Sequence, residues 1–328
     1  MIITRSPMRI SIGGGGTDLP SYYKNFGSRF TSAAINKYIY VIVQERKYYD
    51  EFLIKYSKTE TVKKVKEIEN GLIRESLQLT KIEQPLEIVS ISDIGGQTGL
   101  GSSGAFTVGL LKALHEYKGE TVSKEQLAEE ACEIAINRLK LPSGKQDEYI
   151  ASFGGLTNFE INQEGRVRVD KDAYNEDFVR ELERYLYMFY TGIRRKSKTV
   201  LAEQKKATEQ KDVKILGNLG EVQELGDKIR TTLVDSKVKD FGKLLHKHWL
   251  LKRKRDKTTN MEIDTWYEAA LKSGAIGGKI MGAGGGGFFL FYCDSNGRKL
   301  IEALEKQGLK HIPFNIDYQG TVSLANLR

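Results

Sequence analysis

Three glycine-rich segments are the first places in this sequence where residue type and spacing could do chemistry. They lie at residues 13–16, 95–104 and 282–287. Glycine accepts positive φ and has no Cβ, so the backbone N–H groups of such a segment can approach a phosphate closely. Taken alone, each segment is more typical of a tight turn. The order of the three segments and the polar residues beside them must therefore decide between turns and phosphate binding.

The middle segment combines glycines with two adjacent hydroxyl groups. A dinucleotide-binding loop should directly follow its strand, whereas residues 92–98 intervene here. A Walker A motif is also absent, because Lys145 is followed by Gln146 instead of Ser or Thr. The loose pattern GxGxxG is nevertheless matched by Gly99, Leu100, Gly101, Ser102, Ser103 and Gly104.

A helix is predicted to start directly after this loop, because apolar residues recur at helical spacing from Ala105 to Leu114. The start of a helix presents unpaired N–H donors and a partial charge of about +0.5. The loop could therefore hold phosphate oxygens without a Walker lysine. Ser102 or Ser103 could then bind magnesium, or the two serines could simply cap the helix.

The elements that must position these segments follow from periodicity. Residues 38–43 and 86–91 are rich in β-branched and aromatic residues and predict strands. Residues 62–72 predict a surface helix between them. A capping-box pattern at Ser123 predicts the start of another helix, which ends before Pro142.

The second half of the chain has a different pattern. We place a domain boundary near residue 180, which gives domains 1–180 and 181–328. The elements predicted after this boundary are a strand at 185–190, helices at 216–229 and 238–249, a helix near 266 and a strand at 286–293.

Composition favours a folded protein with an anionic partner. A chain of 328 residues with 40% hydrophobic content can form two compact domains. Its 51 basic and 43 acidic residues give a net charge of +8, which attracts a nucleotide, a sugar phosphate, nucleic acid or an acidic membrane.

The chain has no pattern of a secreted or membrane protein. Cys132 and Cys293 lie far apart without CxxC spacing, so a disulfide framework or a zinc knuckle is not indicated. The start has no apolar run that could form a signal peptide core. The longest apolar stretch, residues 288–293, is far below the ~20 residues that span a bilayer. We expect a soluble cytoplasmic protein with no membrane partner.

In their order and spacing, the three glycine segments resemble the motifs of the GHMP kinases, named for galactokinase, homoserine kinase, mevalonate kinase and phosphomevalonate kinase. The resemblance implies an α+β, two-domain GHMP kinase fold. Its N-terminal part would be a ribosomal-protein-S5-like β/α domain, and its C-terminal part a ferredoxin-like α+β domain. The similar segments are residues 5–18, 99–105, 142–147 followed by 153–155, and 279–287.

The resemblance implies an ATP-dependent phosphotransferase that also uses Mg²⁺. Asp147 would be the catalytic aspartate, and Arg9 would neutralise charge on the transferring phosphate. ATP would bind residues 99–104, with Ser103 as a magnesium ligand. The implied acceptor-binding residues are Asp18, Thr17, Gly15, Gly16, Gly284 and Arg194.

A finer likeness concerns the acceptor. Residues 5–20, 34–41, 144–147 and 190–194 most resemble kinases that phosphorylate D-glycero-D-manno-heptose 7-phosphate at its anomeric hydroxyl, for nucleotide-activated heptose synthesis. Fucokinases are close relatives. The implied partner is a small sugar phosphate, and no oligomeric state is indicated.

Two alternatives remain open from the residues themselves. A non-catalytic sugar or nucleotide sensor on the same fold is one, although retention of both Asp147 and Arg9 favours a kinase. A nucleic-acid-binding protein is the other. The basic run at residues 252–257 lacks interleaved aromatics, so it predicts a solvated helix end and no nucleic-acid partner. Lys279 likewise predicts a solvated helix-end charge.

The sequence departs from the family pattern at two positions. Gly95 stands where proline is common, and Ala135 stands where a magnesium-binding glutamate is usual. Glu130, Glu133 or water could replace that glutamate, so the acidic metal ligand stays unassigned. The candidates for holding the distal phosphate of the acceptor are Arg194, Arg195 and Lys252.

Overall fold

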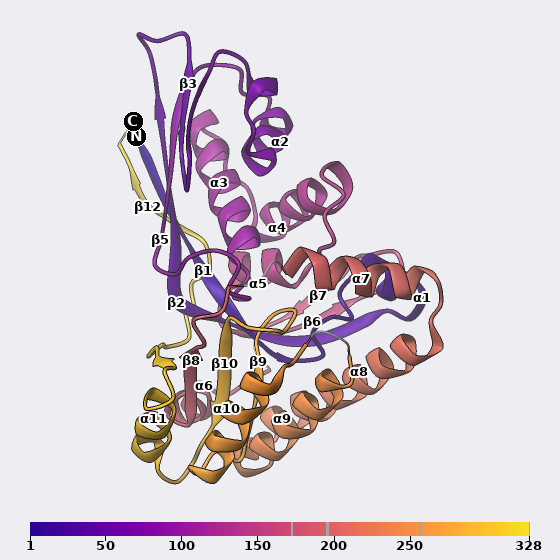
Figure 1. Cartoon of the computed structure of the whole chain (residues 1–328). Coiled ribbons are helices and arrows are strands. Elements are labelled where there is room, and N and C mark those ends of the chain that lie inside the picture. Colours follow the sequence, from indigo (N-terminus) through magenta and orange to yellow (C-terminus); the bar gives the residue numbers. More distant parts are fainter. Residues whose placement is uncertain (172, 195–196, 256–257, 328) are drawn as a thin grey trace.

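The protein is a mixed α+β structure built on a larger and a smaller β-sheet (Figure 1). The computed structural model describes residues 1–171, 173–194, 197–255 and 258–327. Both halves of the chain contain strands and helices. The α+β class predicted from the sequence is confirmed.

The larger sheet has the strand order β12-β1-β2-β5-β3-β4, and β6 joins β2 to β7. The pairs are antiparallel except β3 with β5. β2 is long enough to pair with β6 at its start and with β5 at its end. The predicted strands at 38–43 and 86–91 are confirmed within β2 and β5. The bounds are β1 (Ile2–Gly13), β2 (Ser28–Glu45), β3 (Phe52–Lys55), β4 (Thr59–Val62), β5 (Leu86–Ser92), β6 (Leu156–Ile161), β7 (Val167–Asp170) and β12 (Val322–Asn326).

The helices between β4 and β6 stand against one side of the larger sheet in Figure 1. The helix predicted after the middle glycine segment is confirmed as α3, which packs on β1 and β2. The helix predicted at Ser123 is confirmed as α4, because the Ser123 hydroxyl accepts a hydrogen bond from the Gln126 N–H at 3.1 Å. A π-helical turn, η2 (Glu133–Arg138), extends α4 toward Pro142. The bounds are α2 (Gly71–Thr80), α3 (Ser102–Lys118), α4 (Lys124–Cys132) and α5 (Gln146–Phe153).

The surface helix predicted at residues 62–72 is wrong. β4 ends at Val62, a 3-10 turn η1 (Val65–Glu67) follows, and α2 begins only at Gly71. The carboxylate of Glu60 accepts hydrogen bonds from the backbone N–H groups of Glu69 and Asn70, which holds this segment in a turn. The apolar spacing in this segment therefore reflects a strand, a turn and a helix start that follow one another.

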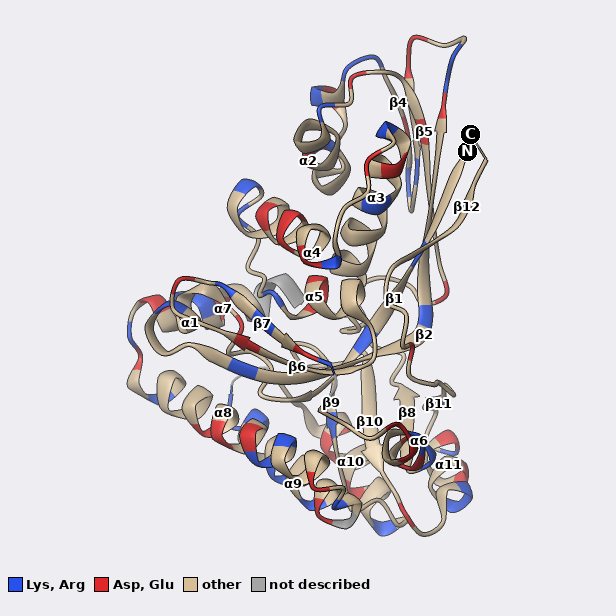
Figure 2. Ribbon diagram, turned by 180° about the vertical axis from the view of Figure 1, so that it is seen from behind, with Lys and Arg blue, Asp and Glu red and all other residues tan. Residues whose placement is uncertain are grey.

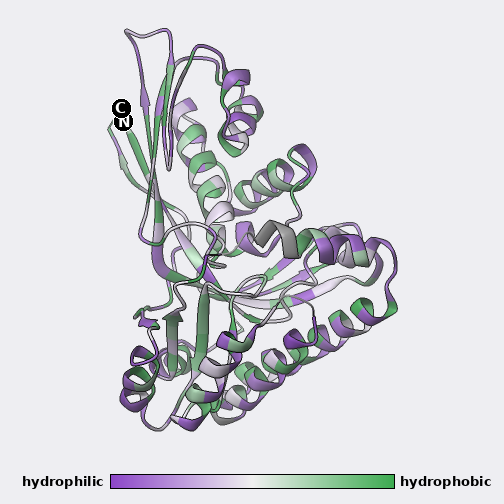
Figure 3. Ribbon diagram, in the orientation of Figure 1, coloured by the Kyte–Doolittle hydropathy of each residue, from purple (hydrophilic) through white to green (hydrophobic). Residues whose placement is uncertain are grey.

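The smaller sheet has the order β11-β8-β10-β9 and is antiparallel throughout. All residues of β10 are buried, and β8 and β10 are among the most hydrophobic strands in Figure 3. The strands predicted at 185–190 and 286–293 are confirmed, as is the helix near residue 266. The bounds are β8 (Leu186–Tyr190), β9 (Gly277–Ile280), β10 (Phe288–Tyr292), β11 (Lys310–His311), α6 (Glu176–Arg184), α10 (Met261–Lys272) and α11 (Gly297–Glu305).

Two long helices, α8 (Val213–Val234) and α9 (Val238–Arg253), connect the two sheets. They pack on each other, and α8 also contacts β1 and β2 while α9 contacts β9. Figure 2 shows charges of both signs interspersed along these helices. Both predicted helices are confirmed. The remaining helices are α1 (Pro20–Phe26) and α7 (Ser197–Glu209), which contact each other.

The chain ends beside its start. β12 pairs with β1, and the Leu327 N–H donates to the Met1 carbonyl oxygen at 2.9 Å, so the two termini lie together in Figure 1. A division near residue 180 remains a proposal. The smaller sheet begins soon after it, at Leu186, whereas β12 returns to the larger sheet. Among the described residues, no helix has the length and apolar character needed to cross a membrane.

Candidate active site

The second and third glycine segments meet although they are far apart in sequence. A Cβ added to Gly282 would lie 2.7 Å from the Cα of Gly99, and one added to Gly99 would lie 2.9 Å from the Met281 carbonyl oxygen. Both glycines also have positive φ, 61° and 84°. Only glycine permits this approach, so the two segments form one wall between the sheets.

The loop before α3 is hydrogen-bonded to Arg9 of β1. The Arg9 N–H donates to the Leu100 carbonyl oxygen at 3.0 Å, and its guanidinium donates to the Gly99 carbonyl oxygen at 2.5 Å. Gly101 is the N-cap residue of α3, with φ of 75°, and no side chain in the described part of the chain caps this helix. The N–H groups of its first turn are therefore available to phosphate oxygens.

The two serines of this loop do not act as caps. Ser102 and Ser103 lie inside the first turn of α3, and Ser103 is exposed. The predicted nucleotide loop thus has the geometry expected for phosphate binding. The hydroxyl of Ser103 is accessible to a ligand at the same helix end.

Asp147, the proposed catalytic aspartate, stands in the first turn of α5 and pairs with Arg9. The Arg9 Nε donates to Asp147 Oδ1 at 2.8 Å, and Nη2 lies 2.6 Å from the same oxygen. The nucleotide loop closes on this pair, because a Cβ on Gly101 would lie 3.1 Å from the Cγ of Asp147 and one on Gly104 would lie 2.7 Å from its Cβ. Arg9 and Asp147, predicted together from the family pattern, thus lie in contact beside the proposed phosphate site.

Asp18 lies next to this pair and is buried. Its carboxylate accepts hydrogen bonds from the backbone N–H groups of Gly16 and Gln146, both at 3.1 Å. Burial raises the pKa of Asp18 above its ordinary value, and the neighbouring charge of Asp147 adds to this effect. A buried carboxylate in this position is suited to bind hydroxyl groups of a polar ligand.

A cavity connects these groups. Among the residues that line it are Arg9, Ser11, Gly15, Gly16, Asp18, Ser143, Gln146 and Asp147 on the larger-sheet side, and His248, Lys252, Arg255, Thr258, Lys279 and Gly282 on the other side. The predicted residues Gly15, Gly16 and Asp18 therefore share one cavity with Arg9 and Asp147.

The basic side chains of this cavity correct two predictions. Lys252 is 7% exposed, and its ammonium group donates to the carbonyl oxygens of Ile280 and Gly282 at 2.7 and 2.5 Å. Lys279 is 2% exposed, lies on β9 and donates to the Ile12 carbonyl oxygen at 2.9 Å. Neither is a solvated helix-end charge, because α9 and β9 pack against the glycine segments. Burial, followed by the charges of Arg9 and Arg255, lowers the pKa of Lys279 to about 7.

Two segments of the chain match models of known protein families. Residues 58–155 match the GHMP kinases N terminal domain, and residues 229–310 match the GHMP kinases C terminal domain. The chain is a GHMP kinase. As a member of that family, it is an ATP-dependent phosphotransferase that acts on a hydroxyl group.

Several known proteins are similar to this GHMP kinase along most of its length. It is 28% identical to the D-glycero-alpha-D-manno-heptose 7-phosphate kinase of Campylobacter jejuni, over 93% of this chain and 94% of that protein. It is 24% identical to the galactokinase of Pyrococcus furiosus, over 67% of this chain and 68% of that protein.

Solved structures show the same fold. A D-glycero-D-manno-heptose 1-phosphate kinase from Bacteroides thetaiotaomicron superposes with a TM-score of 0.81 at 22% identity, over 100% of both chains. A putative sugar kinase from Campylobacter jejuni superposes with a TM-score of 0.76 at 25% identity, over 98% of this chain and 97% of that one.

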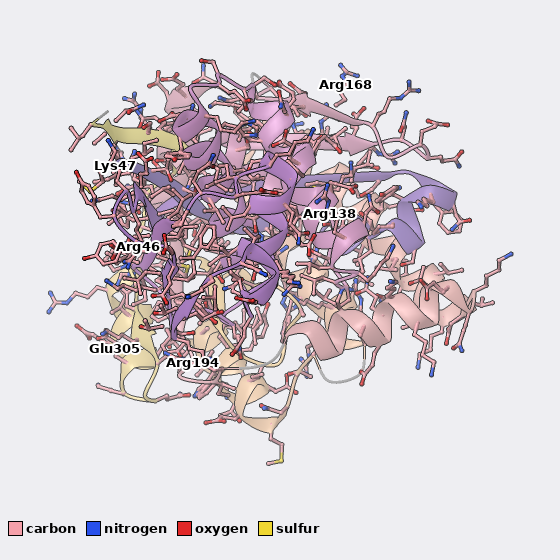
Figure 4. The ribbon with its side chains drawn as sticks, turned by 90° about the horizontal axis from the view of Figure 1, so that it is seen from above. Arg46, Lys47, Arg138, Arg168, Arg194 and Glu305 are labelled. Atoms are coloured by element: carbon pink, nitrogen blue, oxygen red, sulfur yellow. The ribbon has the colours of Figure 1, made fainter. Side chains whose placement is uncertain are left out.

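Three predicted acceptor residues of the kinase lie outside the cavity wall. The Thr17 hydroxyl donates to the Gly14 carbonyl oxygen at 2.8 Å and lies 2.6 Å from the Ser28 hydroxyl. It therefore stabilises the first glycine segment without lining the cavity. Gly284 packs against Thr258, within 3.0 Å of an added Cβ. Arg194, labelled in Figure 4, is exposed and lies beside Gly95, with Nη2 3.1 Å from the position of a Cβ there. Arg195 lies outside the described residues.

The glutamates considered as replacements at Ala135 are used elsewhere in the kinase. Glu130 binds His115 and Gln126, and Glu133 binds Asn137. Ala135 itself is buried. The acidic magnesium ligand therefore stays unassigned.

Sequence reasoning missed three residues of the kinase site. Glu148 is buried next to Asp147, and its Oε2 has no hydrogen-bond partner among the described residues. Burial, and then the charge of Asp147, raises the pKa of Glu148 above its ordinary value. His248 and Arg255 line the cavity with Lys252. His248 lies one helical turn before Lys252 on α9, and Arg255 follows the end of that helix. The four-residue spacing of His248 and Lys252 was the available sequence signal.

Proposed function

We propose that this GHMP sugar kinase transfers the γ-phosphate of ATP to the anomeric C1 hydroxyl of D-glycero-D-manno-heptose 7-phosphate, giving the 1,7-bisphosphate for nucleotide-activated heptose synthesis. The observation that carries the proposal is the contact of three groups. The helix end of α3, the Arg9–Asp147 pair and buried Asp18 all line or border one cavity. The full-length similarity to the heptose 7-phosphate kinase of Campylobacter jejuni supports the acceptor.

The residues divide the work of phosphoryl transfer. The N–H groups at the start of α3 bind the phosphates of ATP, and Arg9 screens the charge that develops on the transferred group. Asp147 Oδ1 is held by Arg9, so Oδ2 is the oxygen that orients the acceptor hydroxyl and takes its proton. Asp18 holds other hydroxyl groups of the sugar. Because the transition state is loose, alignment of the two oxygens is the main task of the protein.

Magnesium, when bound, would neutralise negative charge on the phosphates of ATP. The residues present fit this ion, because Ser103 offers an accessible hydroxyl in the first turn of α3. Magnesium prefers such oxygen ligands and usually keeps several waters. Within the described ranges, no three His, Cys, Asp or Glu side chains gather around a possible metal position. Ser103 would therefore hold the ion, with water completing its coordination.

The test is a panel of acceptors with MgATP. Heptose 7-phosphate, fucose, mannose, galactose and mevalonate are offered at equal concentration, and ADP release is measured. We expect the highest kcat/KM for heptose 7-phosphate, with product phosphorylated at C1 by ³¹P NMR. If a free sugar or mevalonate were the best acceptor, the substrate assignment would be overturned, but the assignment as a kinase would stand.

A further inference from the structure

The cavity has a second charged region, formed by His248 and Lys252 of α9 and by Arg255 just after its end. We propose that Arg255 and His248 form a subsite for a phosphate group carried by the acceptor itself. This inference rests on the proposed function, because it assumes that the reactive hydroxyl of the acceptor lies at Asp147 and concerns the other end of the same acceptor.

Arg255 reaches the cavity next to the proposed sugar anchor. Its Nη1 lies 3.4 Å from the position of a Cβ on Gly16, and the Gly16 N–H donates to Asp18 Oδ1 at 3.1 Å. Asp18 in turn accepts from the Gln146 N–H, the residue before Asp147. The contacts thus follow one order along the wall, from Asp147 through Asp18 and Gly16 to Arg255. An acceptor with its reactive hydroxyl at Asp147 and others at Asp18 extends toward Arg255.

The guanidinium of Arg255 is held in place by hydrogen bonds, but one of its N–H groups has no described partner. Its Nε donates to Asn218 Oδ1 at 2.6 Å, and its Nη1 lies 3.5 Å from Gln204 Oε1. Gln204 is itself held, because its amide donates to the Gly16 carbonyl oxygen at 2.8 Å. The Nη2 group is buried and has no hydrogen-bond partner among the described residues. Arg255 is therefore an oriented cation with a free donor.

His248 adds a second buried polar group without a partner. Its side chain is 3% exposed and lines the cavity one helical turn before Lys252. Across the residues that the structure describes, neither ring nitrogen has a hydrogen-bond partner. A buried polar group without a hydrogen-bond partner destabilises the fold. A ligand oxygen at this position would remove that destabilisation.

The charge of the cavity wall points to an anionic ligand. Arg9, Lys252, Arg255 and Lys279 face only two lining carboxylates, those of Asp18 and Asp147. Arg9 alone is paired with one of them, and no described carboxylate pairs with the other three cations. A phosphate dianion would offset this excess and favour the charged forms of the two buried lysines, whereas a neutral sugar would not.

The two lysines add positive charge to the cavity, but their side chains are already hydrogen-bonded and do not offer a donor to a second phosphate. Lys252 is bound to the third glycine segment, and Lys279 is bound to the carbonyl oxygen of Ile12 in β1. Arg9 is bound to Asp147 and to the nucleotide loop. Arg255 and His248 are the groups of this cluster that keep donors for a second phosphate.

The experiment compares acceptors that differ only in the terminal phosphate. kcat and KM are measured with heptose 7-phosphate and with unphosphorylated heptose, and with mannose 6-phosphate and mannose, for wild type, Arg255→Met and His248→Gln. For whichever of the two acceptor pairs the enzyme turns over, we expect Arg255→Met to lower kcat/KM for the phosphorylated acceptor roughly 10- to 100-fold. This loss should appear as a higher KM. The unphosphorylated member should change less than about two-fold, because it has no group for the subsite.

Lys254→Met is the matched control. It removes a neighbouring cation whose side chain is 63% exposed and pairs only loosely with Glu221, at 3.8 Å. We expect no change for either acceptor. If Arg255→Met does not fold, Arg255→Lys keeps the charge and should show a smaller loss confined to the phosphorylated acceptor. An equal loss with both acceptors, expressed in kcat, would assign Arg255 to the transferred phosphate and overturn the inference.

A binding measurement separates this inference from the proposed function. The wild-type protein is saturated with magnesium and β,γ-imido-ATP, so that the nucleotide phosphate sites are filled, and is then titrated with inorganic phosphate by calorimetry. We expect binding that Arg255→Met abolishes and Lys254→Met retains, whichever sugar is the acceptor. No phosphate binding to the wild-type complex would overturn the subsite. Phosphate binding without turnover of heptose 7-phosphate would overturn only the proposed acceptor.

Discussion

At the scale of single residues, the Arg9–Asp147 pair is the centre of the proposed chemistry. Arg9 is 6% exposed and makes contacts with both the nucleotide loop and the carboxylate. The guanidinium therefore fixes one oxygen of Asp147 relative to the start of α3. Because its position is already fixed, such a carboxylate can align an acceptor hydroxyl with little further loss of conformational entropy.

Replacing Asp147 with asparagine tests this role. The Asp147→Asn side chain would keep an oxygen for Arg9 but could not take a proton, so we expect kcat to fall by about 10²–10⁴-fold. The affinity for ATP, measured by calorimetry, should change little, because the helix end of α3 is unaltered. Asp227→Asn is the control, since Asp227 forms a similar but exposed pair with Arg29. A kcat near that of wild type would remove Asp147 from the mechanism.

At the scale of elements, the packing of α3 against α5 sets the distance between nucleotide and acceptor. The first turn of α3 carries Gly104, whose missing side chain leaves room for Asp147 on α5. α3 is held on β1 and β2, and β1 also carries Arg9. The loop, the arginine and the aspartate thus share one rigid support.

A single methyl group at Gly104 should disturb this support. The Cβ of Gly104→Ala would lie 2.7 Å from Asp147 Cβ and 2.9 Å from its carbonyl carbon, so α5 must move. We expect kcat to fall roughly 10- to 100-fold and stability in urea to fall by about 1–3 kcal/mol.

The matched control is Gly217→Ala in α8. An added Cβ there has no heavy atom within 4 Å, and alanine favours a helix interior by about 0.5–1 kcal/mol. We expect normal activity and slightly higher stability for this variant. Equal activity of the Gly104 and Gly217 variants would contradict the proposed close packing.

At the scale of the whole molecule, contacts between distant segments hold the two sheets around the cavity. Lys279 of the smaller sheet donates to Ile12 of the larger sheet, and α8 and α9 bridge the two. β12 closes the outer side of β1. Thr321, just before β12, bonds to Ser6 and to the Ala151 carbonyl oxygen.

Truncation after Gly320 tests the contribution of β12. Without β12, β1 would become an edge strand with unpaired N–H and C=O groups. We expect a Tm lower by at least several degrees and a loss of activity, because β1 carries Arg9. Leu324→Thr changes only a half-exposed side chain of β12 and should leave Tm within about 1–2 °C. An unchanged Tm of the truncated protein would show that β12 is dispensable.

Local sequence patterns predicted the main elements and the nucleotide loop, because they reflect properties of neighbouring residues. Periodicity located α3, α4, α8 and α9, and the glycine spacing located the loop before α3. Periodicity failed at residues 62–72, where hydrogen bonds from Glu69 and Asn70 to Glu60 set a turn. Such a contact is not encoded in the spacing of apolar residues.

The sequence by itself therefore determined the family, and it predicted the nucleotide loop and the residues matched to its motifs. Only the tertiary structure decided the environment of the charges. Lys252, Lys279 and Arg255 have the local pattern of ordinary surface cations, yet α9 and β9 bring them into one cavity with Asp18. The physical reason is that burial of a charge depends on which distant segments pack over it. A local sequence pattern contains no information about that packing.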